Sequence, residues 1–121
     1  MTQQNKAEYI ARYYGYNTQS RKAMEEAGEL IQAINKYWEV PMENGKVSIE
    51  DAPWGKEEIS LMGELADMQI MIWQMCYFHG MDLTEAIEGK LDRQIRRISM
   101  ERGIPPEQRE RILNTFLGGR R

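Results

Sequence analysis

Two short acidic motifs stand in segments of this 121-residue chain that otherwise have the spacing of helices. The motifs are Glu25-Glu26-Ala27-Gly28-Glu29 and Glu64-Leu65-Ala66-Asp67. Each contains two carboxylates three residues apart, and side chains at that spacing lie on one helix face, with Cβ atoms ~5–6 Å apart. Four carboxylates on two facing helices repel one another unless a cation holds them together. The pattern therefore predicts a site for a hard divalent cation, above all Mg²⁺.

The apolar residues recur at helical spacing along most of the chain, and no stretch alternates apolar and polar residues as a strand does. We therefore expect one all-α domain over residues 1–121, a bundle of four or five helices. Glycines and prolines separate the helical segments. The expected helices cover residues 4–15, 18–38, 57–79 and 83–102, with a last short one after Pro105-Pro106 and a long loop over residues 40–56.

Cap residues mark several of the expected helix boundaries. Gly15 and Gly80 stand where the first and third helices end. Asn17 or Thr18 is the expected N-cap of the second helix, because both side chains accept backbone hydrogen bonds. Asp82-Leu83-Thr84-Glu85 has the spacing of a capping box and predicts the start of the fourth helix.

Residues 68–78 are apolar almost all the way around the third helix. Such a helix is normally buried on every side. A domain of this size has few helices with which to cover it, so another subunit is needed. We therefore expect a homodimer or a homotetramer.

The composition excludes several classes of protein. No apolar run approaches the ~20 residues that span a bilayer, and the single cysteine, Cys76, has no partner for an internal disulfide. A cytoplasmic protein without membrane or nucleic-acid partners is expected. Residues 1–88 carry 7 Lys/Arg and 15 Asp/Glu, whereas residues 89–121 carry 9 and 4. This asymmetry suits either a metal cage with an anion clamp or ordinary surface charge.

A helical projection at about 100° per residue places the two acidic motifs in different surroundings. Glu26 lies at the border of the apolar arc of its helix, and Glu25 points toward solvent. Glu64 and Asp67 lie on an apolar surface, where an unpartnered carboxylate is costly. The alternatives are a solvated helix face for the first motif and salt bridges to Lys or Arg for the second.

Together the motifs resemble the signature of the MazG-like all-α nucleoside triphosphate pyrophosphatases. The residues around the first motif resemble that family's first motif helix, and those of the fourth helix resemble its basic motif. The resemblance covers roughly residues 8–100. The matching stretches are Gln19-x-x-Lys22-x-x-Glu25-Glu26-Ala27-Gly28-Glu29 and Lys90-x-x-Arg93-Gln94-x-x-Arg97.

The resemblance implies hydrolysis of a ribo- or deoxyribonucleoside triphosphate to the monophosphate and pyrophosphate, with Mg²⁺, or Mn²⁺ as the alternative. It implies that the metal ligands are Glu26, Glu29, Glu64 and Asp67. Glu25 then lies in the outer shell of the metal, or helps to orient or deprotonate the attacking water, so that Glu25 and Glu26 are the implied catalytic residues. The implied substrate-binding residues are Gln19, Lys22, Lys90, Arg93 and Arg97, and Trp54 is a candidate for stacking on the base.

Two features depart from the family pattern. The segment between Glu29 and Glu64 is longer than in most members, and an acid, Glu88 or Asp92, stands where many members have Asn. Two other hypotheses stay open. One is a regulatory module that binds metal and nucleotide without turnover. The other is a helical adaptor whose acids pair with Arg93, Arg96 and Arg97.

Overall fold

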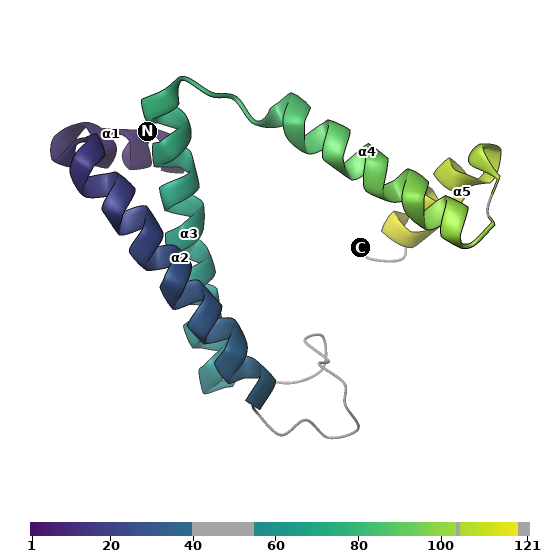
Figure 1. The fold of residues 1–121 in the computed structure, drawn as a ribbon, viewed down its shortest axis with the longest axis horizontal. Helices are drawn as coiled ribbons and strands as arrows, with labels where there is room; N and C mark the ends of the chain where they lie inside the picture. Colours follow the sequence, from purple (N-terminus) through teal and green to yellow (C-terminus); the bar gives the residue numbers. More distant parts are fainter. Residues whose placement is uncertain (40–54, 104, 119–121) are drawn as a thin grey trace. The chain divides into compact units, whose positions relative to one another are not determined.

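The computed structural model of the chain describes residues 1–39, 55–103 and 105–118. Over these residues the fold is all-α, as the periodicity predicted. Most of the expected loop over residues 40–56, including Trp54, lies outside the described residues. The helices are α1 (Gln3–Tyr14), α2 (Tyr16–Glu39), α3 (Lys56–His79), α4 (Thr84–Glu101) and α5 (Pro106–Gly118) (Figure 1).

The helices group into two compact units, Met1–Met81 and Asp82–Arg121, and each is described by itself. The sequence predicted one domain over residues 1–121. None of the helices in the described part of the chain is long and apolar enough to cross a membrane.

Short side chains and glycines set the helix ends. Thr2 caps α1 in a reciprocal capping box with Asn5, and α3 ends at Gly80, whose left-handed φ of 63° suits a residue without a Cβ. The prediction that Asn17 or Thr18 caps α2 is wrong, because α2 begins at Tyr16. The one-residue connection at Gly15 leaves no room for a separate cap. The Gly15 carbonyl accepts the first backbone hydrogen bond of α2, from the Gln19 N–H at 3.0 Å.

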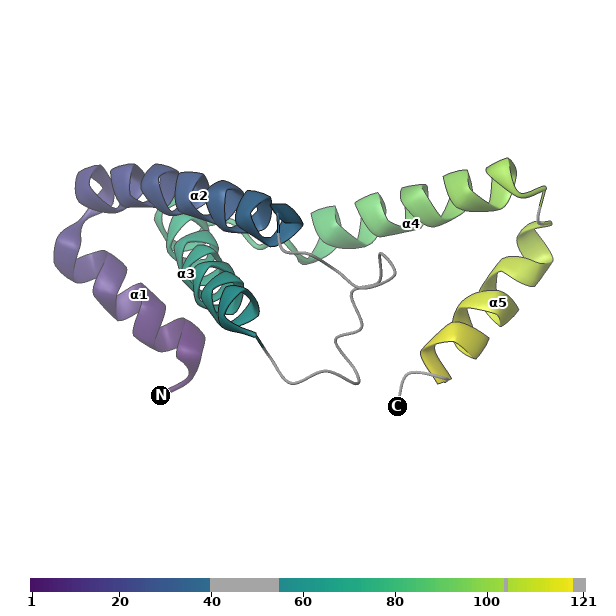
Figure 2. The same cartoon turned by 90° about the horizontal axis from the view of Figure 1, so that it is seen from below.

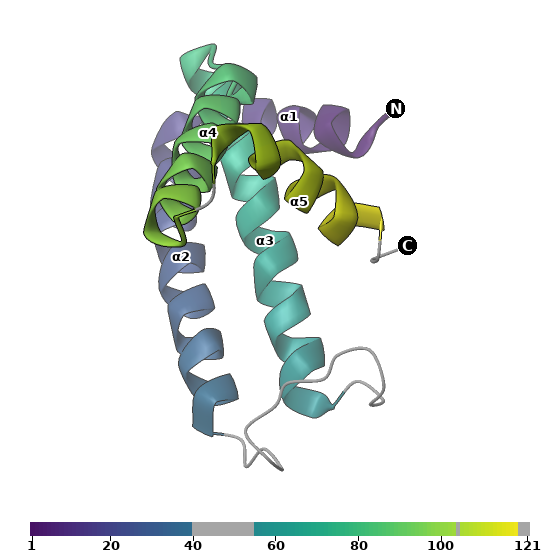
Figure 3. The same cartoon turned by 90° about the vertical axis from the view of Figure 1, so that its right-hand side faces the viewer.

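In the first unit, α2 and α3 run side by side in opposite directions (Figures 1 and 3). Gln19, near the start of α2, bonds Gln74, near the end of α3. At the other end, Tyr37 lies beside Glu58, and burial together with the Glu58 charge raises the pKa of the Tyr37 hydroxyl. These two contacts bracket the acidic motifs, which therefore face each other midway along the pair.

Helix α1 packs on α3 beside this pair (Figure 2). Its buried residues are Ala7 and Ala11, whose small side chains let the two helix backbones approach closely. Where α2 begins and α3 ends, the Tyr16 ring makes edge-on contacts with two other rings. Its centroid lies 5.3 Å from that of Phe78 and 5.4 Å from that of His79. The N-terminal half of α2 and the C-terminal half of α3 are thereby held together.

The second unit consists of α4 and α5, joined by a turn at Gly103, where φ is 65°. The capping box predicted over residues 82–85 does not form, because the N-cap of α4 is Leu83 and no side chain makes a cap bond there. Asp82, one residue before that N-cap, instead bonds Thr84, the first residue of α4. Its Oδ1 accepts bonds from the Thr84 backbone N–H at 2.9 Å and the Thr84 hydroxyl at 2.6 Å. These bonds lower the pKa of the Asp82 carboxyl, because they stabilise its ionised form.

Candidate metal centre

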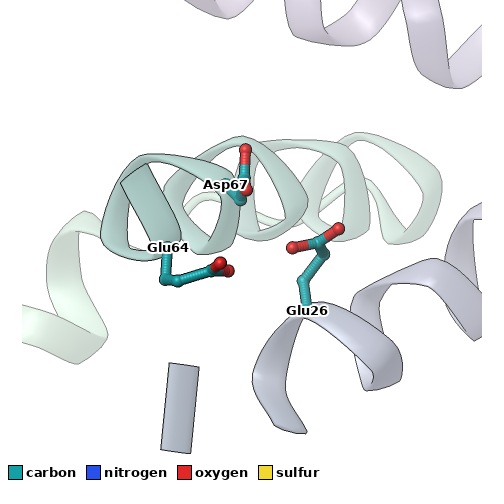
Figure 4. Close-up of side chains that lie close together, drawn as sticks. All are labelled: Glu26, Glu64 and Asp67. Carbon is teal, nitrogen blue, oxygen red and sulfur yellow. The ribbon is translucent and has the colours of Figure 1, made fainter. Parts of the chain in front are cut away.

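Three of the four predicted metal ligands meet between α2 and α3. Glu26 comes from α2, and Glu64 and Asp67 come from α3, one helical turn apart (Figure 4). One carboxylate oxygen from each residue lies within 4.8 Å of the other two. The facing helices thus converge three acids on one point.

Burial distinguishes this group from an ordinary acidic surface. Glu26 is only 7% exposed, Glu64 is half-buried and Asp67 is exposed. Oε2 of Glu26 and Oε2 of Glu64 are both buried without a hydrogen-bond partner. A carboxylate oxygen removed from water without a donor carries a free-energy cost, which a bound cation offsets.

Glu29, the fourth predicted ligand, lies on the exposed edge of this group. It does not belong to the three acids whose oxygens converge. The negative charge of Glu26 is the largest cause that raises the pKa of the Glu29 carboxyl, followed by partial desolvation and the charges of Glu64 and Glu25. Glu29 therefore lies within electrostatic reach of both motifs, beside an accumulation of negative charge.

In the described part of the chain, Lys22 is the one cationic residue that contacts any of the three acids. Its Nζ lies 3.4 Å from Glu26 Oε1, one turn along α2, and its side chain is half exposed. Because the Lys22 end of the pair is open to solvent, the pair adds little stability. Lys22, Arg21 and Glu25 also line an open pocket with Asn17 and Thr18. Glu25 is exposed and does not belong to the three acids whose oxygens converge.

Gln19 has a different environment from the one its predicted contact with a nucleotide suggests. Its side chain is 2% exposed, and its Nε2 donates a 2.7 Å bond to Oε1 of Gln74, which is fully buried. Sequence reasoning missed Gln74. A partial signal was available, because Gln74 is one of only two glutamines in the otherwise apolar stretch over residues 68–78 and lies seven residues after Asp67.

The predicted phosphate-binding residues Lys90, Arg93 and Arg97 belong to α4 of the second unit, and all three side chains are exposed. Their spacing places them within about 60° of one another around the helix. They form one basic stripe, apart from the apolar residues Ile87, Leu91 and Ile98. Trp54 lies outside the described residues.

The donor set fits a hard divalent cation. Carboxylate oxygens are the ligands that Mg²⁺ prefers, at ~2.0–2.1 Å from the ion, so two ligands of one ion are at most ~4.2 Å apart. Oxygens that lie within 4.8 Å of one another need to shift by only a few tenths of an ångström to reach that spacing.

Comparisons with protein-family models, curated proteins and solved structures find no match to this chain.

Proposed function

We propose that this chain is a Mg²⁺-dependent nucleoside triphosphate pyrophosphohydrolase of the MazG-like type. It converts a ribo- or deoxyribonucleoside triphosphate to the monophosphate and pyrophosphate, which removes unwanted nucleotides from the pool. The observation that carries the proposal is the convergence of Glu26, Glu64 and Asp67 on one point, with two buried oxygens left without donors. The motif resemblance supplies the reaction.

In this proposal Glu26, Glu64 and Asp67 hold the ion, and Glu29 joins them from the exposed edge. A Mg²⁺ ion held by these carboxylates would supply Lewis-acid chemistry, which offsets developing negative charge on a phosphate and activates a water. Three protein carboxylates leave coordination positions for water and substrate, which matches the way Mg²⁺ is commonly used with phosphate substrates. Mn²⁺ suits the same oxygen donors.

Other residues of the chain act on the substrate and the water. Glu25 orients or deprotonates the attacking water from the outer side of α2. Lys22 is next to Glu26 and supplies a positive charge to the phosphates. That Lys90, Arg93 and Arg97 hold the triphosphate stays a prediction from the motif resemblance, in keeping with the forked contacts that guanidinium groups make with phosphate oxygens. Contacts of Gln19 and Trp54 with the nucleotide stay predictions.

The experiment is pyrophosphate release from a panel of ribo- and deoxyribonucleoside triphosphates, with Mg²⁺ and with EDTA. Release that requires Mg²⁺, and that falls at least ~100-fold in Glu26→Gln and Asp67→Asn, supports the proposal. Glu57→Gln is the matched control, because Glu57 is an exposed acid at the start of α3, outside the converging group. Tight nucleotide and metal binding without release from any triphosphate would favour the regulatory module.

A further inference from the structure

A second group of polar side chains lies on α2, on the N-terminal side of the candidate metal centre. The open pocket lined by Lys22 and Glu25 has a volume of about 490 Å³, which is within the ~300–1,000 Å³ of small-ligand sites. Its other lining residues are Asn17, Thr18 and Arg21. The pocket therefore presents two cations, a side-chain amide and a hydroxyl, with one carboxylate among them.

The guanidinium group of this pocket has no partner within the described part of the chain. The ion pair at the pocket joins Lys22 to Glu26, and none of the described residues pairs with Arg21, although Glu25 is one helical turn away. Arg21 is exposed, and a guanidinium group carries five N–H donors in a planar fork. Arg21 can therefore exchange water for a ligand without breaking a contact inside the protein.

The pocket is continuous with the metal centre through Lys22. Its Nζ lies 3.4 Å from Oε1 of Glu26, and Oε2 of Glu26 is buried without a hydrogen-bond partner. Lys22 and Glu29 are seven residues apart, which places them within about 20° of each other around α2. Glu29 lies on the exposed edge of the metal centre. A ligand held by the carboxylates can therefore extend along that edge of α2 into the pocket.

The spacing along α2 suits a ligand with several linked phosphate groups. At ~1.5 Å per residue, Lys22 and Arg21 lie about 6 Å and about 7.5 Å from Glu26 along the helix axis, and Asn17 lies about 13.5 Å away. Both cations are thus between the carboxylates and the far end of the pocket. Phosphate groups that follow the one held at the carboxylates would meet these two cations first.

We propose that this pocket, hereafter the phosphate pocket, holds the two phosphate groups that leave as pyrophosphate, with Arg21 as their forked contact. This inference rests on the proposed function, because it names where that site holds one part of its substrate. Charge-assisted hydrogen bonds from Arg and Lys to phosphate are stronger than neutral ones, and the planar fork of Arg suits two oxygens at once. The nucleoside of the substrate then points away from the phosphate pocket.

The chemistry of the phosphate pocket favours phosphate over a nucleobase. Its lining in the described part of the chain contains no aromatic or large apolar side chain, whereas pockets for flat organic groups are mostly apolar. A base would also leave the charge of Arg21 without a counter-ion. The chain has a formal net charge of -3, so binding of a polyanion requires a local group of cations such as Arg21 and Lys22.

The test is the affinity of the full chain for inorganic pyrophosphate, measured by titration calorimetry with Mg²⁺ and again with EDTA. We expect Arg21→Gln to weaken binding at least about tenfold under both conditions, because it removes charge-assisted hydrogen bonds. Arg21→Lys keeps the charge without the fork and should lose less. Arg12→Gln is the matched control, since Arg12 is exposed on α1 and does not line the pocket.

Titration with a panel of nucleoside monophosphates separates the two ends of the substrate. Arg21→Gln should bind them as wild type does. If Arg21→Gln weakens monophosphate binding and leaves pyrophosphate binding unchanged, the pocket holds the nucleoside end and the proposal is overturned. Equal pyrophosphate affinity in wild type, Arg21→Gln and Arg12→Gln, or a wild-type chain that does not bind pyrophosphate, would overturn it as well.

These outcomes are separate from those of the proposed function, because titration with pyrophosphate requires no turnover. A loss of pyrophosphate affinity in Arg21→Gln, in a protein that hydrolyses no triphosphate, would support the phosphate pocket and contradict the enzymatic function. Mg²⁺-dependent hydrolysis together with unchanged pyrophosphate affinity in Arg21→Gln would support the enzymatic function and contradict the phosphate pocket.

Discussion

The Gln19 side-chain amide donates a 2.7 Å hydrogen bond to Gln74 Oε1, and both residues are buried between α2 and α3. Gln19 lies seven residues before Glu26, and Gln74 lies seven residues after Asp67, so the amide pair is two helical turns from the carboxylates on both helices. A single buried polar contact between helices favours one register over its neighbours. This bond therefore fixes the register in which Glu26 faces Asp67.

Breaking this pair should destabilise the protein more than replacing both of its members. Gln19→Leu or Gln74→Leu leaves one buried amide without its partner, which should lower the free energy of unfolding by ~1–3 kcal/mol. The double variant should cost less than the sum of the single ones, because no amide is then left unpaired between the helices. Urea unfolding of the four proteins in EDTA measures this difference, and strictly additive losses would contradict the importance of the bond.

Mg²⁺ should stabilise the folded protein through the converging carboxylates. A ligand that binds only the folded state adds ~2.7 kcal/mol at one hundred times its Kd. Thermal unfolding with and without Mg²⁺ should therefore show a rise in Tm that is lost in Glu26→Gln and Asp67→Asn and retained in Glu57→Gln. An equal rise in all four proteins would show that the ion binds elsewhere.

Replacing Glu29 should have opposite effects with and without metal. Its pKa is raised, above all by the Glu26 charge, so the folded state loses stability as pH rises from the unfolded pKa through the folded one. That loss is complete at pH values above the folded pKa. Glu29→Gln should therefore raise Tm in EDTA at pH 7 and lower the affinity for Mg²⁺. Thermal scans and calorimetric titration give the two quantities, and a lower Tm in EDTA would contradict the account.

The bonds between Asp82 and Thr84 should make the second unit sensitive to acid. The pKa of Asp82 is lowered by its bonds to Thr84. These bonds therefore stabilise the start of α4 fully above the ordinary Asp pKa, and this contribution is lost as pH falls through the folded value. Asp82→Ala should reduce helicity at pH 7 and leave it closer to that of wild type at strongly acidic pH. Far-UV circular dichroism across that range measures the change, and an equal loss of helicity at both pH values would contradict it.

The helices were predictable because their information is local. The sequence pattern predicted the bounds of α1, α3 and α4 and the start of α5 to within one residue, and Gly80 marked the end of α3 because a left-handed residue there favours glycine. The predicted start of α2 was wrong. The sequence did not show whether α2 begins directly after Gly15 or at Thr18, because this depends on how closely α1 and α2 follow each other.

The site was predictable only in part, because the burial of each side chain depends on packing between helices. Carboxylates three residues apart indicated which acids share a face, and Glu26, Glu64 and Asp67 do converge. The sequence did not reveal that Glu29 is left at the edge, or that Gln19 is buried against Gln74. Those outcomes depend on the angle and register between α2 and α3, which no single helix specifies.

The most direct test of the proposed function is the identity of the products, followed by phosphorus NMR, when the full chain is incubated with a nucleoside triphosphate and Mg²⁺. The account predicts nucleoside monophosphate and pyrophosphate in equal amounts from at least one triphosphate, with neither formed in EDTA or by Asp67→Asn. Formation of diphosphate and inorganic phosphate, or unchanged turnover by Asp67→Asn, would contradict it.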